Sequence, residues 1–215
     1  MSVPTDAPQS SRPGPLVLGV LGGIASGKSR VAKLLAGDVG RILDADKLAH
    51  EALDSAEIQP QVLAAFGQDL LGAEGKIDRQ RLGERIFADP GARKQLEDWI
   101  HPVVRARIRA GLDEARSLGL PRIVLDVPLL LENDAEHGLA ALCDLLVFID
   151  SPLDEREARA RERRGWKAGE VARREATQLP LLKKRARADF VVENYGSLDE
   201  LAASVAQILE EIDAA

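Results

Sequence analysis

The sequence has little cysteine, few aromatic residues and no long apolar run. Its single cysteine, Cys143, excludes an internal disulfide and a thiolate zinc cluster, which predicts a buried thiol in a reducing, cytoplasmic compartment. Aromatic residues make up only 3% of the chain and the net charge is −6, so nucleic acid is not an expected partner. No apolar stretch reaches the roughly 20 residues of a membrane span, so we expect no membrane association.

Residues 1–15 are rich in Pro and Ser and contain no apolar core, which predicts a disordered N-terminal arm rather than a signal peptide. Residues 16–215 are enough for one hydrophobic core with a small inserted subdomain. The chain contains no internal repeat and no long linker. We therefore expect a single domain, and we expect it to be a monomer.

The most informative motif is a glycine-rich loop. Residues 22–29 read Gly-Gly-Ile-Ala-Ser-Gly-Lys-Ser and follow the apolar run 16–21. This is the G-x-x-x-x-G-K-[ST] pattern of a phosphate-binding loop between a strand and a helix. Its backbone N–H groups can surround an anion, Lys28 can reach the β- and γ-phosphates, and the Ser29 hydroxyl is the expected Mg²⁺ ligand. The motif predicts binding of a nucleoside triphosphate.

Short apolar runs alternate with helical patterns along the rest of the chain. Strands are predicted at 16–21, 41–43, 122–127, 145–149 and 190–192. Helices are predicted at 28–36, 46–55, 59–66, 79–87, 102–118, 153–163, 167–178 and 198–212. Strands rich in Val, Ile and Leu that alternate with helices indicate an α/β fold, a five-stranded parallel sheet flanked by helices.

Two segments interrupt this alternation. Residues 48–118 show only helical patterns, which predicts a helical substrate-binding insertion between the second and third strands. Residues 153–187 contain an excess of positive charge, with twelve Lys or Arg against six Asp or Glu between positions 154 and 187. A basic helical segment here is predicted to be a lid over the triphosphate. The core is then formed by residues 16–47, 119–152 and 188–215.

Carboxylates stand at the ends of the second and third predicted strands. Asp44 and Asp46 follow the second strand, and Asp126 ends the third. Because parallel strand ends meet at one edge of an open sheet, a carboxylate here can orient an acceptor hydroxyl and take its proton. One of the first two carboxylates could instead cap the following helix. Asp126 is predicted to hold Mg²⁺ through water, or else to start the turn before a proline.

Arginines and histidines supply further candidates. Arg159 and Arg163 are four residues apart on one predicted helix face, so together they could contact the transferred phosphoryl group. His50 follows Asp46 by four residues on the same helix face, and His101 precedes the helix at 102–118. Each histidine could contact a substrate or be structural.

The order of these motifs resembles that of the dephospho-CoA kinase family. The matching blocks are residues 22–29, 42–50, 77–79 with Leu82, 86–90, 100–105, 124–132, Gln178, Pro180, Lys184, 188–189 and 194–198. The blocks Asp-Ala-Asp-x-x-Ala-His and Ile-x-His-Pro-x-Val-Arg are more specific than the phosphate loop itself. The matches extend from about residue 18 to the last predicted helix.

The resemblance implies a P-loop NTPase fold and ATP-dependent phosphorylation of the ribose 3′-hydroxyl of dephospho-CoA, with small molecules as the partners and Mg²⁺ as the cation. It implies that Asp46 is the catalytic base and that Lys28, Arg159 and Arg163 assist. It assigns ATP binding to Gly23, Ile24, Ala25, Ser26, Gly27, Lys28, Ser29 and Arg30. It assigns acceptor binding to Asp46, His50, Arg79, His101 and Arg105, and the metal to Ser29 and Asp126.

Three departures from the family pattern stand out. Ala25 replaces a usual loop glycine, which predicts a φ angle below zero at that position. Arg30 replaces a usual threonine and is expected to change contacts to the α-phosphate. Arg156 and the stretch 164–167 differ from the usual lid.

Other functions share parts of this pattern. A different nucleoside or nucleotide kinase would share the phosphate loop but would not explain the His-Pro block. A GTP-binding switch should carry Asn-Lys-x-Asp, which the sequence lacks, and its D-x-x-G match at 69–72 lies in the helical insertion. A regulatory protein that only binds ATP would not need Asp46 and the lid arginines.

Overall fold

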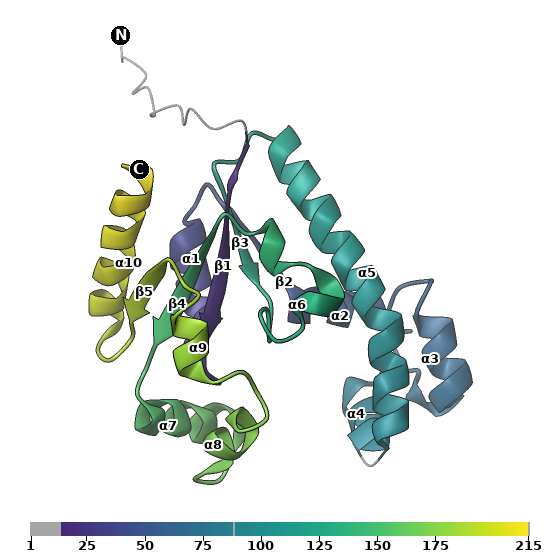
Figure 1. Ribbon diagram of the computed structural model, residues 1–215. Coiled ribbons are helices and arrows are strands. Elements are labelled where there is room, and N and C mark those ends of the chain that lie inside the picture. Colours follow the sequence, from purple (N-terminus) through teal and green to yellow (C-terminus); the bar gives the residue numbers. More distant parts are fainter. Residues whose placement is uncertain (1–13, 88, 215) are drawn as a thin grey trace.

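The computed structural model describes residues 14–87 and 89–214 and contains one parallel sheet at its centre (Figure 1). The sheet has five strands in the order β2-β3-β1-β4-β5. The strands are β1 (Leu16–Gly22), β2 (Arg41–Asp44), β3 (Arg122–Asp126), β4 (Leu145–Asp150) and β5 (Phe190–Glu193). The five predicted strands and their parallel arrangement are confirmed. The predicted N-terminal arm falls mostly on residues 1–13, which lie outside the described residues.

Helices cover both faces of the sheet (Figure 1). They are α1 (Lys28–Ala36), α2 (Ala45–Leu53), α3 (Gln59–Phe66), α4 (Arg79–Phe87), α5 (Pro90–Ser117), α6 (Asp134–His137), α7 (Leu153–Arg164), α8 (Glu170–Glu175), α9 (Leu181–Arg185) and α10 (Leu198–Asp213). Two short 3₁₀ turns, η1 (Gln68–Leu70) and η2 (Ala140–Leu142), were not predicted. None of these helices, within the residues that the structure describes, combines the length and hydropathy needed to cross a membrane.

The two faces of the sheet bury separate apolar clusters because side chains alternate along each strand. Leu18 and Val20 of β1 pack with residues of α1 and α10 on one face. Val17 and Leu21 of the same strand belong to the cluster on the other face, which includes residues of α2 and α5. With both faces covered, the carboxyl ends of the strands are left as the edge available for binding.

The longest helix differs from the prediction. Residues 102–118 were expected to be helical, whereas α5 begins twelve residues earlier at Pro90, with Asp89 accepting hydrogen bonds from Gly91 and Ala92 as the N-cap. Pro102 lies inside the helix without ending it. The reason is the continuous buried stripe Leu96, Ile100, Val104, Ile108, Leu112 and Ala115, whose burial outweighs the hydrogen bond that Pro102 cannot make.

The predicted lid contains a short helical hairpin. Gly165 ends α7 and Gly169 precedes α8, both with positive φ angles (64° and 80°) that suit glycine. The helix predicted at 167–178 is therefore wrong in extent, since only 170–175 is α-helical. The further helix α9, not predicted, packs against β1 rather than on the hairpin. Figure 1 shows α7 and α8 below the strand ends, across from α3 and α4.

Candidate active site

The phosphate loop joins β1 to α1. Gly27 has a φ angle of 98° and precedes the first turn of α1, a conformation that an L side chain rarely adopts. The Lys28 ammonium donates hydrogen bonds to the carbonyl oxygens of Gly22 (3.2 Å) and Gly23 (2.9 Å). Helix α1 thus begins at the loop, and its N-terminal N–H groups and partial positive charge are available to an anion.

Burial gives Lys28 an unusual pKa. Removal of its ammonium group from water lowers the pKa to about 8, and the negative charges of Asp126 and Glu175 partly oppose this shift. The positive charges of Lys184 and Arg164 lower the pKa further. Because its surroundings disfavour the positive charge, Lys28 is suited to bind an anionic ligand, whose negative charge would stabilise the ammonium form.

Ala25 contradicts the expectation drawn from the sequence. Its φ angle is +58°, so it adopts the left-handed conformation instead of a φ below zero. A residue with a Cβ atom is disfavoured there by about 1–2 kcal/mol. The neighbouring peptide groups must therefore be held by other parts of the protein.

Two carboxylates follow the second strand, and one of them caps the next helix. Asp44 is the N-cap of α2 and accepts a hydrogen bond from the Lys47 N–H (3.0 Å). Asp46 lies in the first turn of α2. Burial raises the pKa of the Asp46 carboxyl, the nearby charge of Asp44 raises it further, and the charges of His50, Arg164 and Lys28 oppose the shift. Asp46 is therefore near enough to the phosphate loop for Lys28 to influence its titration.

Asp126 ends β3 next to Asp44, its register partner in β2. Its side chain is buried, which raises the pKa of the carboxyl, while a hydrogen bond with the Ser29 side chain and the charge of Lys28 oppose the shift. Ser29 and Asp126, the two predicted metal ligands, are thus in contact. Among the described residues there is no group of three or more His, Cys, Asp or Glu that could hold a metal ion. A hydroxyl and a carboxylate fit Mg²⁺ shared with phosphate oxygens, since Mg²⁺ prefers oxygen ligands and keeps several waters.

A cavity of about 480 Å³ extends from Asp46 between α2, α5 and the segment after β3. Its lining includes the predicted acceptor residues Asp46, His101 and Arg105. The remaining lining residues are Ala45, Ala49, Arg93, Glu97, Val104, Val127, Pro128, Leu129, Asn133, Glu136, His137 and Leu139. The size and the mixture of apolar and charged groups suit an organic phosphate.

Two predicted acceptor residues do not line this cavity. His50 lies one helical turn beyond Asp46 on α2, and its charge lowers the pKa of that carboxyl. Arg79 is exposed at the start of α4. Conversely, Arg93 and His137 line the cavity without having been predicted. Residues 90–101 of α5, which include Arg93, were not predicted to be helical, so the position of Arg93 on the same helix face as His101 and Arg105 was not predicted either.

The two arginines predicted to lie in the lid have different surroundings. Arg159 donates hydrogen bonds to the Ser151 hydroxyl (2.8 Å) and to the carbonyl oxygens of Ala25 and Asn194 (both 3.3 Å). Arg163 is exposed at the end of α7. Arg164, which was not singled out, is the lid arginine whose charge acts on both Asp46 and Lys28.

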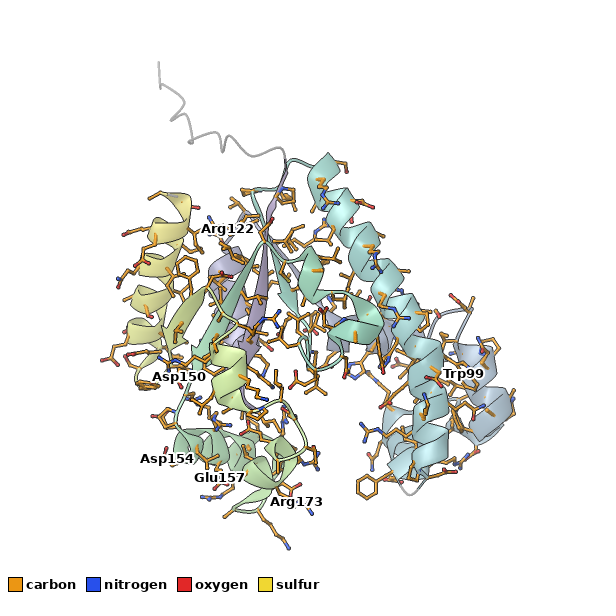
Figure 2. The ribbon with its side chains drawn as sticks, in the orientation of Figure 1. Trp99, Arg122, Asp150, Asp154, Glu157 and Arg173 are labelled. Carbon is orange, nitrogen blue, oxygen red and sulfur yellow. The ribbon has the colours of Figure 1, made fainter. Side chains whose placement is uncertain are left out.

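Trp166 orients Arg164. The Arg164 guanidinium carbon lies 4.9 Å from the centre of the indole ring, and that of Arg174 lies 4.2 Å from it. Such cation–π contacts restrict long side chains. The only sequence signal for this arrangement was the departure of residues 164–167 from the usual lid. Figure 2 shows Glu157 and Arg173 on the same hairpin, away from Trp99 of the insertion.

A buried ion pair connects the lid to the strand ends. The Lys184 ammonium lies 2.6 Å from Glu132 Oε1, with side-chain exposures of 5% and 13%. The Leu179 N–H also donates to Glu132 (3.3 Å), and Lys184 donates to the Gln178 side chain (3.4 Å). These residues belong to blocks that match the family, but the sequence did not suggest that they contact one another.

Comparisons with known proteins identify a family. The dephospho-CoA kinase family model matches residues 16–200. A dephospho-CoA kinase of Anaeromyxobacter dehalogenans is 40% identical over 197 residues, 91% of this chain and 92% of that protein. The crystal structure of TT1252 from Thermus thermophilus superposes with a TM-score of 0.71 at 35% identity, covering 93% of this chain and 98% of that one. The dephospho-CoA kinase from Campylobacter jejuni gives a TM-score of 0.68 at 25% identity, with 93% and 98% covered. Together with the phosphate loop and the carboxylates beside it, these matches establish that the chain belongs to the dephospho-CoA kinase family.

Proposed function

We propose that this protein transfers the γ-phosphoryl group of ATP to the ribose 3′-hydroxyl of dephospho-CoA, the last step of coenzyme A synthesis, and that Asp46 is the catalytic base. The observation that carries this proposal is the position of Asp46. Its carboxyl lines the cavity for the acceptor, and its pKa responds to Lys28 of the phosphate loop. A carboxylate between a phosphate site and an acceptor site is what a kinase needs.

In the proposed reaction the acceptor hydroxyl donates its proton to the Asp46 carboxylate while its oxygen attacks the γ-phosphorus. The bond from that phosphorus to the oxygen shared with the β-phosphate breaks, and ADP leaves with the bonding electrons. The raised pKa of Asp46 makes it a better proton acceptor than an ordinary aspartate, as general-base catalysis near neutral pH requires.

The phosphate loop binds the triphosphate in this proposal. Lys28 turns from the carbonyls of Gly22 and Gly23 toward the β- and γ-phosphates, whose negative charge stabilises its ammonium group. The ATP contacts expected along the loop are those of Gly23, Ile24, Ala25, Ser26, Gly27, Lys28, Ser29 and Arg30.

Ser29 and Asp126 are the residues that would hold Mg²⁺, and their side chains already hydrogen-bond to each other. Bound Mg²⁺ would neutralise charge on the phosphate oxygens. Asp126 is buried at the carboxyl edge of the sheet, where its side chain contacts Ser29.

His101 and Arg105 are proposed to bind the acceptor from the wall of the cavity, and Arg93 adds a third cationic group there. His50 is proposed to act behind Asp46 as a neighbour that favours its charged form. Arg79 would contact the acceptor only after α4 moves toward the cavity, because its side chain is exposed.

Arg159 and Arg163 remain proposed contacts of the transferred phosphoryl group. Arg159 lies against the loop backbone at Ala25, close to the expected phosphates. Arg163 would need the lid to close. Arg164 is proposed as a further contact, since its charge acts on Lys28 and Asp46.

The test is ³¹P NMR of the product formed from ATP, Mg²⁺ and dephospho-CoA, with adenosine and dCMP as competing acceptors. A 3′-phosphomonoester on dephospho-CoA and no phosphorylation of the competitors is expected. Preferred phosphorylation of a competitor would favour another nucleotide kinase. Release of inorganic phosphate without any phosphorylated acceptor would instead favour an ATPase.

A monomer is proposed as the functional unit, because one chain supplies the phosphate loop, the acceptor cavity and the lid. Small molecules are its proposed partners. A reducing, cytoplasmic compartment is proposed from the single cysteine, which cannot form an internal disulfide. Sedimentation of the protein with and without ATP tests whether it is a monomer.

A further inference from the structure

The phosphate loop is held from outside by side chains of α7 and of the segment that follows β5. Three consecutive carbonyl oxygens, those of Ile24, Ala25 and Ser26, accept hydrogen bonds from Arg156 (3.4 Å), Arg159 (3.3 Å) and Asn194 (2.7 Å). Since three successive carbonyls are engaged by side chains that pack against the loop, the path of its backbone is fixed along this whole stretch.

Glu175 holds the same segment by its N–H group. Its Oε1 accepts a hydrogen bond from the Ile24 N–H (2.6 Å) and also lies 2.5 Å from the Arg156 guanidinium. Both side chains are largely buried, with exposures of 5% for Arg156 and 14% for Glu175. A Cβ atom at Gly23 would lie 2.6 Å from each of them, so only glycine at that position lets the pair approach.

These contacts surround the left-handed residue. The peptide group before Ala25 is held at its carbonyl by Arg156, and the peptide group after it is held by Arg159. The orientations of these two groups define the backbone angles of Ala25, whose φ is +58°. A strained conformation persists only where its surroundings determine it.

We propose that Arg156 and Glu175 are positioning residues for the kinase reaction, which hold the peptide groups on both sides of Ile24 and thereby keep Ala25 in the left-handed conformation that the phosphate loop needs. Ala25 and Arg156 are both departures from the family pattern. A glycine at position 25 would need less restraint, because glycine adopts a positive φ without a Cβ penalty. With alanine at this position, the Arg156–Glu175 pair supplies the restraint.

This inference rests on the proposed binding of ATP by the loop. The test uses the full chain with both residues changed to leucine, R156L/E175L, because changing only one would leave a buried charge without its partner. Calorimetric binding of ADP is the main measurement, and KM values for ATP and dephospho-CoA are measured beside it. The same variant is then combined with Ala25→Gly.

Weaker ADP binding, by about ten-fold, is expected for the double variant, since the competent loop conformation becomes a minor one. The KM for dephospho-CoA should stay within about two-fold, because its cavity is formed by other elements. Adding Ala25→Gly should restore most of the ADP affinity. A matched control, R116L/D113L, changes an exposed Arg–Asp pair of α5 and should leave ADP binding unaltered.

Two results overturn the inference. Unchanged or tighter ADP binding by R156L/E175L would mean that the pair does not support the loop. Weaker binding that Ala25→Gly fails to restore would mean that the pair does not act through Ala25. If the double variant does not fold, Arg156→Lys replaces it, since lysine cannot reproduce the fork of guanidinium hydrogen bonds and should show a smaller, glycine-rescued loss. Activity of the unchanged protein tests the proposed function separately.

Discussion

Asp44 of β2 and Asp126 of β3 are register partners at the carboxyl ends of adjacent parallel strands. One caps the next helix and the other contacts Ser29 of the phosphate loop. Asp46 follows within one turn of α2, at the wall of the acceptor cavity. Three carboxylates thus lie at one edge of the sheet in three different surroundings.

Asp46→Asn should lower kcat by at least about 100-fold, because an amide cannot accept the proton of the acceptor hydroxyl. ATP affinity should be nearly unchanged, since the phosphate loop is intact. Steady-state kinetics and calorimetric ATP binding measure the two effects. Asp38→Asn, on an exposed carboxylate after α1, is the control. A near-normal kcat for Asp46→Asn would remove Asp46 from the role of base.

The pH profile should have two limbs of different origin. Because the pKa of Lys28 is lowered to about 8, its ammonium loses the proton as the pH rises through that value, and kcat/KM for ATP should fall above it. In the ATP complex the triphosphate keeps the proton on Lys28, so kcat should stay flat there. A fall in kcat/KM for ATP that persists unchanged in Lys28→Ala would assign the alkaline limb to another group.

The acid limb belongs to Asp46 in this scheme. Its raised pKa means that the carboxyl becomes protonated, and inactive as a base, at a higher pH than an ordinary aspartate does. Activity with dephospho-CoA should therefore decline as the pH is lowered through this raised value. The residual activity of Asp46→Asn should lack this limb, and its persistence would contradict the assignment.

Arg164→Gln should lower kcat/KM for ATP by about ten-fold, because it removes the lid charge that acts on Lys28 and Asp46. Trp166→Leu should give a smaller loss by freeing the Arg164 side chain. Arg173→Gln, on the exposed ion pair with Glu170, is the matched control and should have little effect. Equal kinetics for the Arg164 and Arg173 variants would exclude a role for Arg164.

Lys184→Met should lower the free energy of unfolding by about 3 kcal/mol, because it leaves the Glu132 carboxylate buried without its partner. The double variant K184M/E132L should be more stable than Lys184→Met alone, since no charge is left unpaired. Lys94→Met, which breaks an exposed pair with Asp98, should cost less than about 1 kcal/mol. Urea denaturation compares them, and a loss for Lys184→Met as small as that of the control would contradict the prediction.

In two places where the sequence-based prediction was wrong, contacts distant in sequence were responsible. Pro102 suggested the start of a helix, yet the helix continues through it because its apolar stripe is buried against α2 and the sheet. Ala25 suggested a negative φ, yet Arg156 and Arg159 of α7 hold the neighbouring carbonyls. In both cases tertiary contacts outweigh a local preference.

The sequence alone determined the phosphate loop, the parallel sheet and the carboxylates at its edge, because each depends on short-range spacing and on the period of apolar residues. Which side chains contact one another depended on the packing of elements that are distant in sequence. The tertiary structure joined Glu175 to Ile24, across 151 positions of the chain, and placed the Arg164 guanidinium over the Trp166 ring. Such contacts depend on how the lid packs on the strand ends, and no local pattern encodes that packing.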